Sequence, residues 1–153
     1  MADAAAAIRA VLFAAGSRQE KACAVAESIR SIGPHRWVGL YDVDAQFVTI
    51  IAFSGPGAPA FPAFPVTKGL TSAAIRDKAP LIVSDVRNDP RYLTAFGSTL
   101  SEIIIPVLNP VDGRVIGTVD VESERANAFG AADSERLQCL AGAALPLWTS
   151  LQS

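Results

Sequence analysis

Two segments with the composition of β-strands carry acids at positions where the core of a sheet favours apolar side chains. Glu102 lies at the head of the hydrophobic run 101–107. Asp120 and Glu122 lie within the run 115–122. Because strand side chains alternate between the two faces of a sheet, Asp120 and Glu122 share one face. The chain must therefore either expose these acids to solvent at strand ends or enclose them in a pocket.

A third strand-like segment, residues 36–41, places aromatic residues on one face. By the same alternation, Trp37, Gly39 and Tyr41 point to the same side. If this face meets the acidic face, the result is a pocket with aromatic walls and carboxylates at its base. Such a pocket favours a small-molecule ligand with a cationic or hydrogen-donating group. The alternative is that Trp37 and Tyr41 are core residues and that the acids face solvent.

The composition is that of one globular domain, which we place over residues 1–153. Hydrophobic residues make up 50% of the 153 residues and charged residues 18%, so much of the chain can be buried. The net charge is −2 and Lys and Arg form no cluster, which argues against a nucleic-acid partner. No apolar run reaches the roughly 20 residues that cross a bilayer, so we expect no membrane partner.

The alanine-rich start of the chain predicts a helix rather than a signal peptide, because Asp3 and Arg9 interrupt it. A cytoplasmic location is the default expectation. Ser17 and Glu20 fit a capping box that opens a second helix. A C-terminal helix begins near Ala131, and Pro146 should kink it. The residues whose helical spacing predicts core contacts are Ile8, Val11, Leu12, Ala15, Ala22, Val25, Ala26, Ile29, Leu137, Leu140, Ala141, Ala144 and Trp148.

The middle of the chain contributes the strands of a sheet. Strand patterns lie at 36–41, 46–53, 81–83, 101–108 and 114–122, and the turns between several of them predict hairpins. The predicted fold class is α+β, with a central antiparallel sheet of about six strands and the N- and C-terminal helices packed on one face. The wide apolar faces of these helices lead us to expect a homodimer.

Residues 54–65 are rich in Pro and Gly and predict a loop. Phe61 and Phe64 either anchor this loop on the core or serve as a lid over the pocket. A short helix should follow over 69–78, and its first amides, near Gly69, Leu70, Thr71 and Ser72, would be free to bind an anion.

Several of these segments resemble a GAF domain over nearly the whole chain. They are Val83–Tyr92, Ser101–Val107, Val115–Ser123 and Asn127–Phe129. Within that family, the chain is most similar to the free methionine-R-sulfoxide reductase group. That group has a Trp-x-Gly-x-Tyr strand, a Ser-Glu-Ile strand start and an Asp-x-Asp pair. Here these are matched by Trp37, Gly39 and Tyr41, by Ser101 and Glu102, and by Asp120 with Glu122, one methylene longer than Asp. The resemblance implies that these groups line the ligand pocket.

The resemblance does not extend to the redox cysteines of the reductases. Phe61, Thr71 and Ala95 stand at the three corresponding positions, and none of them can supply a thiolate. Cys23 and Cys139 lie inside predicted amphipathic helices, where we expect them to be small buried hydrophobes without a redox role. The two cysteines and the one histidine, His35, have no metal-ligand spacing, so we expect neither a metal nor a cofactor.

Three hypotheses follow. The first is a binding module without chemistry. Its site would consist of Trp37, Tyr41, Phe61, Phe64, Gly69, Leu70, Thr71, Ser72, Glu102, Asp120 and Glu122. The second is a diverged methionine sulfoxide reductase that uses an unexpected thiol. The third is a dimeric interaction protein whose pocket is vestigial.

Overall fold

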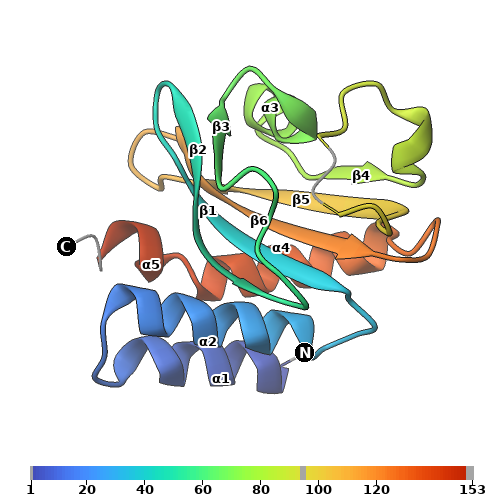
Figure 1. Ribbon diagram of the computed structural model, residues 1–153. Coiled ribbons are helices and arrows are strands. Elements are labelled where there is room, and N and C mark those ends of the chain that lie inside the picture. Colours follow the sequence, from blue (N-terminus) through green and yellow to red (C-terminus); the bar gives the residue numbers. More distant parts are fainter. Residues whose placement is uncertain (1, 94–95, 151–153) are drawn as a thin grey trace.

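One antiparallel sheet organises the computed structural model, which describes residues 2–93 and 96–150. Within this part of the chain the sheet has six strands in the order β3-β2-β1-β6-β5-β4. Figure 1 shows the sheet between two layers. The strands are β1 Trp37–Val43, β2 Phe47–Ser54, β3 Ala63–Pro65, β4 Leu81–Val83, β5 Ser101–Leu108 and β6 Val115–Ser123.

The helices at the two ends of the chain cover one face of the sheet (Figure 1). They are α1 Ala2–Phe13, α2 Arg18–Arg30, α4 Ala131–Ala143 and α5 Pro146–Thr149. The opposite face carries the helix α3 Gly69–Asp77 and, nearby in the chain, the 3₁₀ helix η1 Val86–Asn88. The largest apolar core lies between the terminal helices and the sheet, and it includes Ile29, Leu40, Ile103 and Trp148. The predicted α+β class and the placement of the terminal helices are confirmed.

Short polar residues fix the two hairpin turns. Between β1 and β2, the Asp44 carboxylate accepts hydrogen bonds of 2.7 Å from the N–H groups of Gln46 and Phe47. Between β5 and β6, the Asn109 carboxamide accepts one of 2.9 Å from the N–H of Val111. Gly113 has a φ of +74°, which glycine adopts without steric cost. Both turns were predicted from the Asp, Asn and Gly residues in the sequence.

Helix starts follow the sequence signals, while one helix end differs. The Ser17 hydroxyl accepts a hydrogen bond of 3.1 Å from the Glu20 N–H and so caps α2. Helix α1 ends at Phe13, and Ala15, which we expected to face the core, is exposed. Ala15 fits the helical spacing of the sequence, but α1 ends before it, because the chain turns there toward Ser17, the N-cap of α2. No described helix has the combined length and apolar character needed to cross a bilayer.

The proline-rich segment differs from the prediction. We expected residues 54–65 to form a loop, but Ser54 ends β2 and Ala63–Pro65 form β3. Pro65 fits here because β3 is the edge strand of the sheet, where a missing N–H is tolerated. The remaining residues, 55–62, form a loop, which we call the roof loop.

The C-terminal helix α5 is attached to the sheet beneath β1. The Trp148 indole donates a hydrogen bond to the carbonyl of Tyr41. A Cβ added to Gly117 would lie 2.1 Å from the indole nitrogen, so this position on β6 needs glycine. Arg18, at the start of α2, donates to the Leu147 carbonyl at 2.9 Å and to both carboxylate oxygens of Asp42.

Candidate functional site

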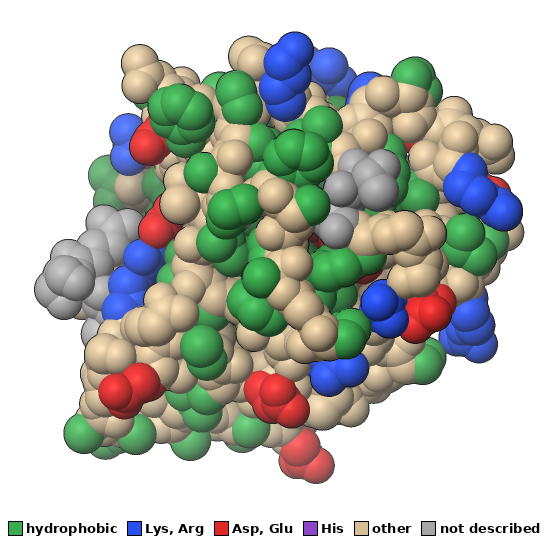
Figure 2. Space-filling model, viewed as in Figure 1, with side chains coloured by type: hydrophobic (Ala, Val, Ile, Leu, Met, Phe, Trp, Pro, Cys, Tyr) green, Lys and Arg blue, Asp and Glu red, His purple; other side chains and the backbone are tan. Residues whose placement is uncertain are grey.

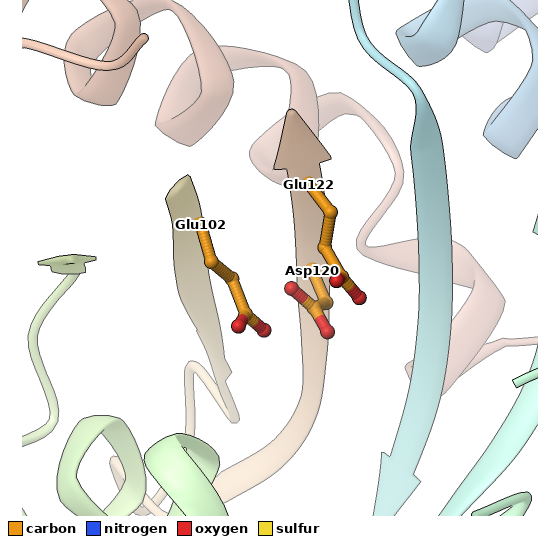
Figure 3. A group of neighbouring side chains, drawn as sticks. All are labelled: Glu102, Asp120 and Glu122. Atoms are coloured by element: carbon orange, nitrogen blue, oxygen red, sulfur yellow. The ribbon is translucent and has the colours of Figure 1, made fainter. Parts of the chain in front are cut away.

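Three carboxyl groups meet on the face of the sheet that lies opposite the terminal helices. Glu102 and Glu122 are paired across β5 and β6, and Asp120 is two residues before Glu122 on β6. One oxygen from each carboxyl lies within 4.8 Å of the others. Figure 3 shows the three side chains pointing into the same space. Glu102, Asp120 and Glu122 are 5%, 7% and 1% exposed, which rejects the interpretation that they face solvent.

Burial and mutual repulsion change the acidity of all three groups. The pKa of Glu102 is raised well above its usual value, first by burial and then by the nearby Asp120 and Glu122. Burial raises the pKa of Asp120 to about 6, although a hydrogen bond with Glu102 opposes this. Burial and Asp120 raise the pKa of Glu122 to about 8. At neutral pH the cluster therefore holds protons, and the hydrogen bond between Glu102 and Asp120 favours the proton on Glu102.

The hydrogen bonds of the three carboxyls are uneven. One oxygen of Glu122 accepts from the Thr99 hydroxyl at 2.7 Å and from the Tyr92 hydroxyl at 3.4 Å. By contrast, Glu102 Oε2 and Asp120 Oδ1 are buried and accept no hydrogen bond from any other described residue, so the proton held between the two carboxyls is their one source of hydrogen bonding there. Buried carboxylate oxygens without a donor are costly. These two atoms are thus the ones that a ligand with N–H or O–H donors would satisfy.

A small cavity lies above the acids, and we call it the acid cavity. Its volume is about 40 Å³, which is room for a few water molecules. The described residues that line it are Tyr41, Pro59, Phe61, Phe64, Gly69, Leu70, Thr71, Tyr92, Leu93, Glu102, Asp120 and Glu122. No lysine, arginine or histidine is among them. The roof loop and α3 cover the cavity. Figure 2 shows hydrophobic side chains over the middle of the side of the molecule on which the roof loop lies in Figure 1.

Aromatic side chains form the wall that extends from β1. Trp37 and Tyr41 belong to one cluster, with ring centroids 6.4 Å apart. The Trp37 ring also stacks on Phe53 and lies tilted against Phe96. Its indole donates a hydrogen bond of 3.0 Å to the Gly57 carbonyl in the roof loop. Tyr41 lines the acid cavity, whereas Trp37 does not. Trp37 therefore supports the roof loop in this structure.

The start of α3 forms another side of the acid cavity. Gly69 has a φ of +76°, and a Cβ added there would lie 3.0 Å from Leu93 Cδ1. Lys68, at the N-cap position, makes no side-chain capping hydrogen bond. Gly69, Leu70 and Thr71 line the cavity, but the Ser72 hydroxyl donates to the Gly69 carbonyl within the helix. The first turn of α3 thus leaves backbone donors close to the cavity.

Most of the site residues that the sequence predicted lie around this one cavity. Trp37 and Ser72 are the two that do not line it. Sequence reasoning missed Pro59, Tyr92 and Leu93. Pro59 could have been included among the site residues, because it belongs to the same Pro- and Gly-rich segment as Phe61. Tyr92 and Leu93 lie in irregular chain after η1, where no periodicity indicates which way a side chain points.

The cysteines of this chain do not lie where the reductases have theirs. Phe61 and Thr71, which stand where the reductases have cysteines, both line the acid cavity, and Ala95 lies outside the described residues. The prediction that Cys23 and Cys139 are buried is wrong, because both are exposed. Each lies beside the apolar stripe of its helix rather than on it. Helices α2 and α4 cover the other face of the sheet, so neither thiol shares the layer that holds the acids (Figure 1).

The three carboxyl groups limit which ions or ligand groups the site could hold. Among the described residues, Glu102, Asp120 and Glu122 form the group with a spacing suited to a metal ion. The same three oxygens would equally surround an ammonium group, which has three donors.

Comparisons with known proteins agree with this architecture. The sequence model of the GAF domain matches residues 17–144. GAF domain-containing protein A from Dictyostelium discoideum is 32% identical over 102 residues, which are 66% of this chain and 62% of that protein. Free methionine-R-sulfoxide reductase from Saccharomyces cerevisiae is 31% identical over 106 residues, 69% of this chain and 58% of that protein. The chain thus spans about six-tenths of the length of these relatives.

The fold is also that of a solved structure. A GAF sensor protein from Burkholderia vietnamiensis superposes with a TM-score of 0.86 at 23% identity, over 99% of this chain and 96% of that one.

Proposed function

Because the chain belongs to the GAF domain family, we propose that it is a sensor-type binding domain for a small polar ligand that carries a cationic group, such as an amino acid. One observation carries this proposal: Glu102, Asp120 and Glu122 are buried together in a cavity whose described lining has no basic side chain. Buried carboxylates are stable when they are paired with a cation or hold protons. A ligand ammonium group would replace the protons and donate to Glu102 Oε2 and Asp120 Oδ1.

The other walls of the acid cavity suit the rest of an amino acid. The Tyr41 ring lies beside the acids and would contribute a cation–π contact. The amides in the first turn of α3 would accept the ligand carboxylate, since the N-terminus of a helix favours anions. Phe61 and Phe64 would cover the apolar part of the ligand.

Binding requires the roof to open. The present volume of about 40 Å³ is far below the roughly 300–1,000 Å³ of ligand pockets. The roof loop is the element to move, because it is irregular and carries Pro59 and Phe61 over the acids.

Binding without chemistry is favoured over reduction. Thiol reduction of a sulfoxide needs a thiolate at the substrate, and Phe61 and Thr71 stand in the cavity at two of the positions concerned. The similarity to a free methionine-R-sulfoxide reductase keeps the reductase as the second candidate. It would have to use Cys23 or Cys139, which are exposed.

A thermal-shift screen tests the binding proposal. We would compare free L-methionine, L-methionine sulfoxide and L-lysine with N-acetyl-L-methionine, which lacks the cation. A ligand at 100 times its dissociation constant should raise the free energy of unfolding by about 2.7 kcal/mol. Glu102→Gln and Asp120→Asn should weaken the hit about tenfold or more, and Glu135→Gln, an exposed acid on α4, should not. Equal binding of the acetylated compound, or unchanged affinity in both site variants, would refute the proposal.

A turnover assay separates the two candidates. With dithiothreitol as reductant, the binding domain should leave free methionine-R-sulfoxide unchanged. Consumption that is lost in Cys23→Ser or Cys139→Ser would instead establish the reductase.

A further inference from the structure

A second cleft lies beyond the ends of β1 and β6 that carry Trp37 and Glu122. Its volume is about 640 Å³, and it is open to solvent. It is lined by Arg30, Pro34, His35, Arg36, Gly55, Pro56, Ser123, Glu124 and Arg125. None of these residues lines the acid cavity. We call this second site the arginine cleft.

The arginine cleft carries excess positive charge. Three arginines and one glutamate leave its lining with two net positive charges when His35 is neutral. Arg30 Nε donates to the Arg36 carbonyl at 3.0 Å, which fixes the Arg30 guanidinium beside the cleft. Arg36 Nη1 donates to Glu124 at 2.9 Å. Arg125 forms no side-chain ion pair with any described residue, so its guanidinium remains available.

Two nitrogens in the cleft walls are buried without a partner. Arg36 Nε is always a donor, and it has no acceptor among the described residues. His35 Nε2 is also buried and unpartnered. The His35 ring stacks on Phe129 with centroids 5.8 Å apart. Unpaired buried polar atoms are rare in proteins, and a bound ion or an ordered water is one explanation for them.

We propose that the arginine cleft binds a phosphate group, either as inorganic phosphate or as part of a phosphomonoester, between the guanidinium groups of Arg30, Arg36 and Arg125. A phosphate carries about −1.5 to −2 charges at pH 7, which matches the excess charge of the lining. The planar forks of arginine bind phosphate oxygens in pairs. Glu124 is the competing anion, because it now holds Arg36, and a bound phosphate would displace it.

His35 offers a specific reporter, because it is the only histidine of the chain and lines the arginine cleft. Its pKa is lowered by burial and by Arg136, while Asp133 acts in the opposite direction. An anion nearby stabilises the imidazolium form, so phosphate should raise the pKa of His35. The proton resonance of His35 Cε1 can be followed by NMR without assigning the other side chains.

The experiment titrates the protein with inorganic phosphate and with O-phosphoserine, against sodium chloride at equal ionic strength. We expect a saturable shift of the His35 resonance and a raised His35 pKa with at least one phosphate compound, and neither with chloride. Arg125→Gln should weaken binding about tenfold. Arg9→Gln, an exposed arginine on α1, is the matched control and should have no effect.

The two compounds also distinguish a site for free phosphate from a site for a phosphomonoester. Binding of both would support a site for the phosphate group itself, and binding of O-phosphoserine only would support a monoester ligand. The proposal is overturned if neither compound gives a saturable shift, if chloride reproduces the shift, or if Arg125→Gln and Arg9→Gln behave alike. Because Arg125 is exposed, its substitution should leave the fold intact, which the thermal unfolding midpoint would check.

Discussion

The indole Nε1 of Trp148 donates a hydrogen bond of 3.0 Å to the carbonyl oxygen of Tyr41. The side chain of Tyr41 lines the acid cavity on the other face of the sheet. The register between β1 and β2 shifts between Leu40 and Tyr41, and the indole bonds to the backbone at this irregularity. One residue of the cavity wall is thus held from behind by the C-terminal helix.

We predict that the fold depends on this contact. Gly117→Ala should lower the free energy of unfolding by about 1–3 kcal/mol, because the new methyl group would overlap the Trp148 indole. Trp148→Phe should cost a similar amount, since it removes the indole that donates to the Tyr41 carbonyl. Gly142→Ala is the control: nothing lies within 4 Å of its Cβ position, so α4 should be unchanged or stabilised. Chemical denaturation measures all three, and equal stabilities would contradict the prediction.

Stability should fall as pH rises above neutral. The folded-state pKa of Glu122 is about 8 against an ordinary value of 4.5, so between these values the folded protein holds a proton that the unfolded chain has lost. Its contribution to stability is therefore complete at low pH and is lost as pH rises through about 8. Between pH 6.5 and 8 we expect Glu122 alone to account for a loss of about 2 kcal/mol. Glu102, whose pKa is also raised, adds a loss of the same sign.

The range above pH 6.5 is chosen because His35, whose pKa is lowered from 6.5, gives a slope of opposite sign below it. Denaturation at several pH values measures the effect. In Glu122→Gln the slope should become shallower, and the part due to Glu102 should remain. A wild-type stability that is level or rises over this range would show that the acids are not buried together.

Both thiols should react in the folded protein. Cys23 and Cys139 are exposed, so iodoacetamide should modify both without denaturant, as mass spectrometry would detect. The doubly modified protein should keep its unfolding midpoint and its affinity for any ligand of the acid cavity, since the helices that carry the thiols cover the other face of the sheet. Protection of either thiol until the protein unfolds would contradict the exposed placement.

Loss of the Trp37 indole should loosen the roof loop. Trp37→Phe removes the hydrogen bond to Gly57, at a cost of about 1 kcal/mol. Amide hydrogen exchange in residues 55–62 should become faster, while exchange in β5 and β6 should not change. Trp148→Phe serves as the comparison, because it removes an indole on the other face and should leave the roof loop unchanged. Slow exchange of the roof loop in Trp37→Phe would argue against this anchoring role.

The arrangement of the acids could be predicted because strand periodicity is a local property. Once β6 was identified, Asp120 and Glu122 had to lie on one face of it. Trp37 and Tyr41 had to share a face of β1 for the same reason. That Glu102 would join them depended on the register of β5 against β6, which the sequence pattern does not determine. The GAF resemblance implied that Glu102 lines the same pocket, and the structure has Glu102 opposite Glu122.

Other features depend on contacts between distant residues and could not be predicted. The strand β3 forms because Phe64 and its neighbours pair with β2, although the local proline content favours a loop. The exposure of Cys23 and Cys139 depends on how far the apolar stripe of each helix extends around it, and a position beside the stripe is ambiguous in sequence. The arginine cleft combines residues from four parts of the chain, which carry no common motif.

The roof loop is attached to the same strand at both of its ends. It leaves β2 at Ser54, and it returns at Ala63 to the strand β3, which pairs again with β2. The two ends lie apart along β2, because Ala63 pairs with Thr49 while the loop leaves the strand at Ser54. The loop can lift while every strand keeps its partners, once the hydrogen bonds from the Ile50 N–H to the Pro62 carbonyl and from the Trp37 indole to the Gly57 carbonyl break. Exchange of a ligand would then require only a local opening, with a free energy below that of global unfolding. Residence times in the acid cavity would follow the opening of the roof loop and would be insensitive to mutations that merely stabilise the core.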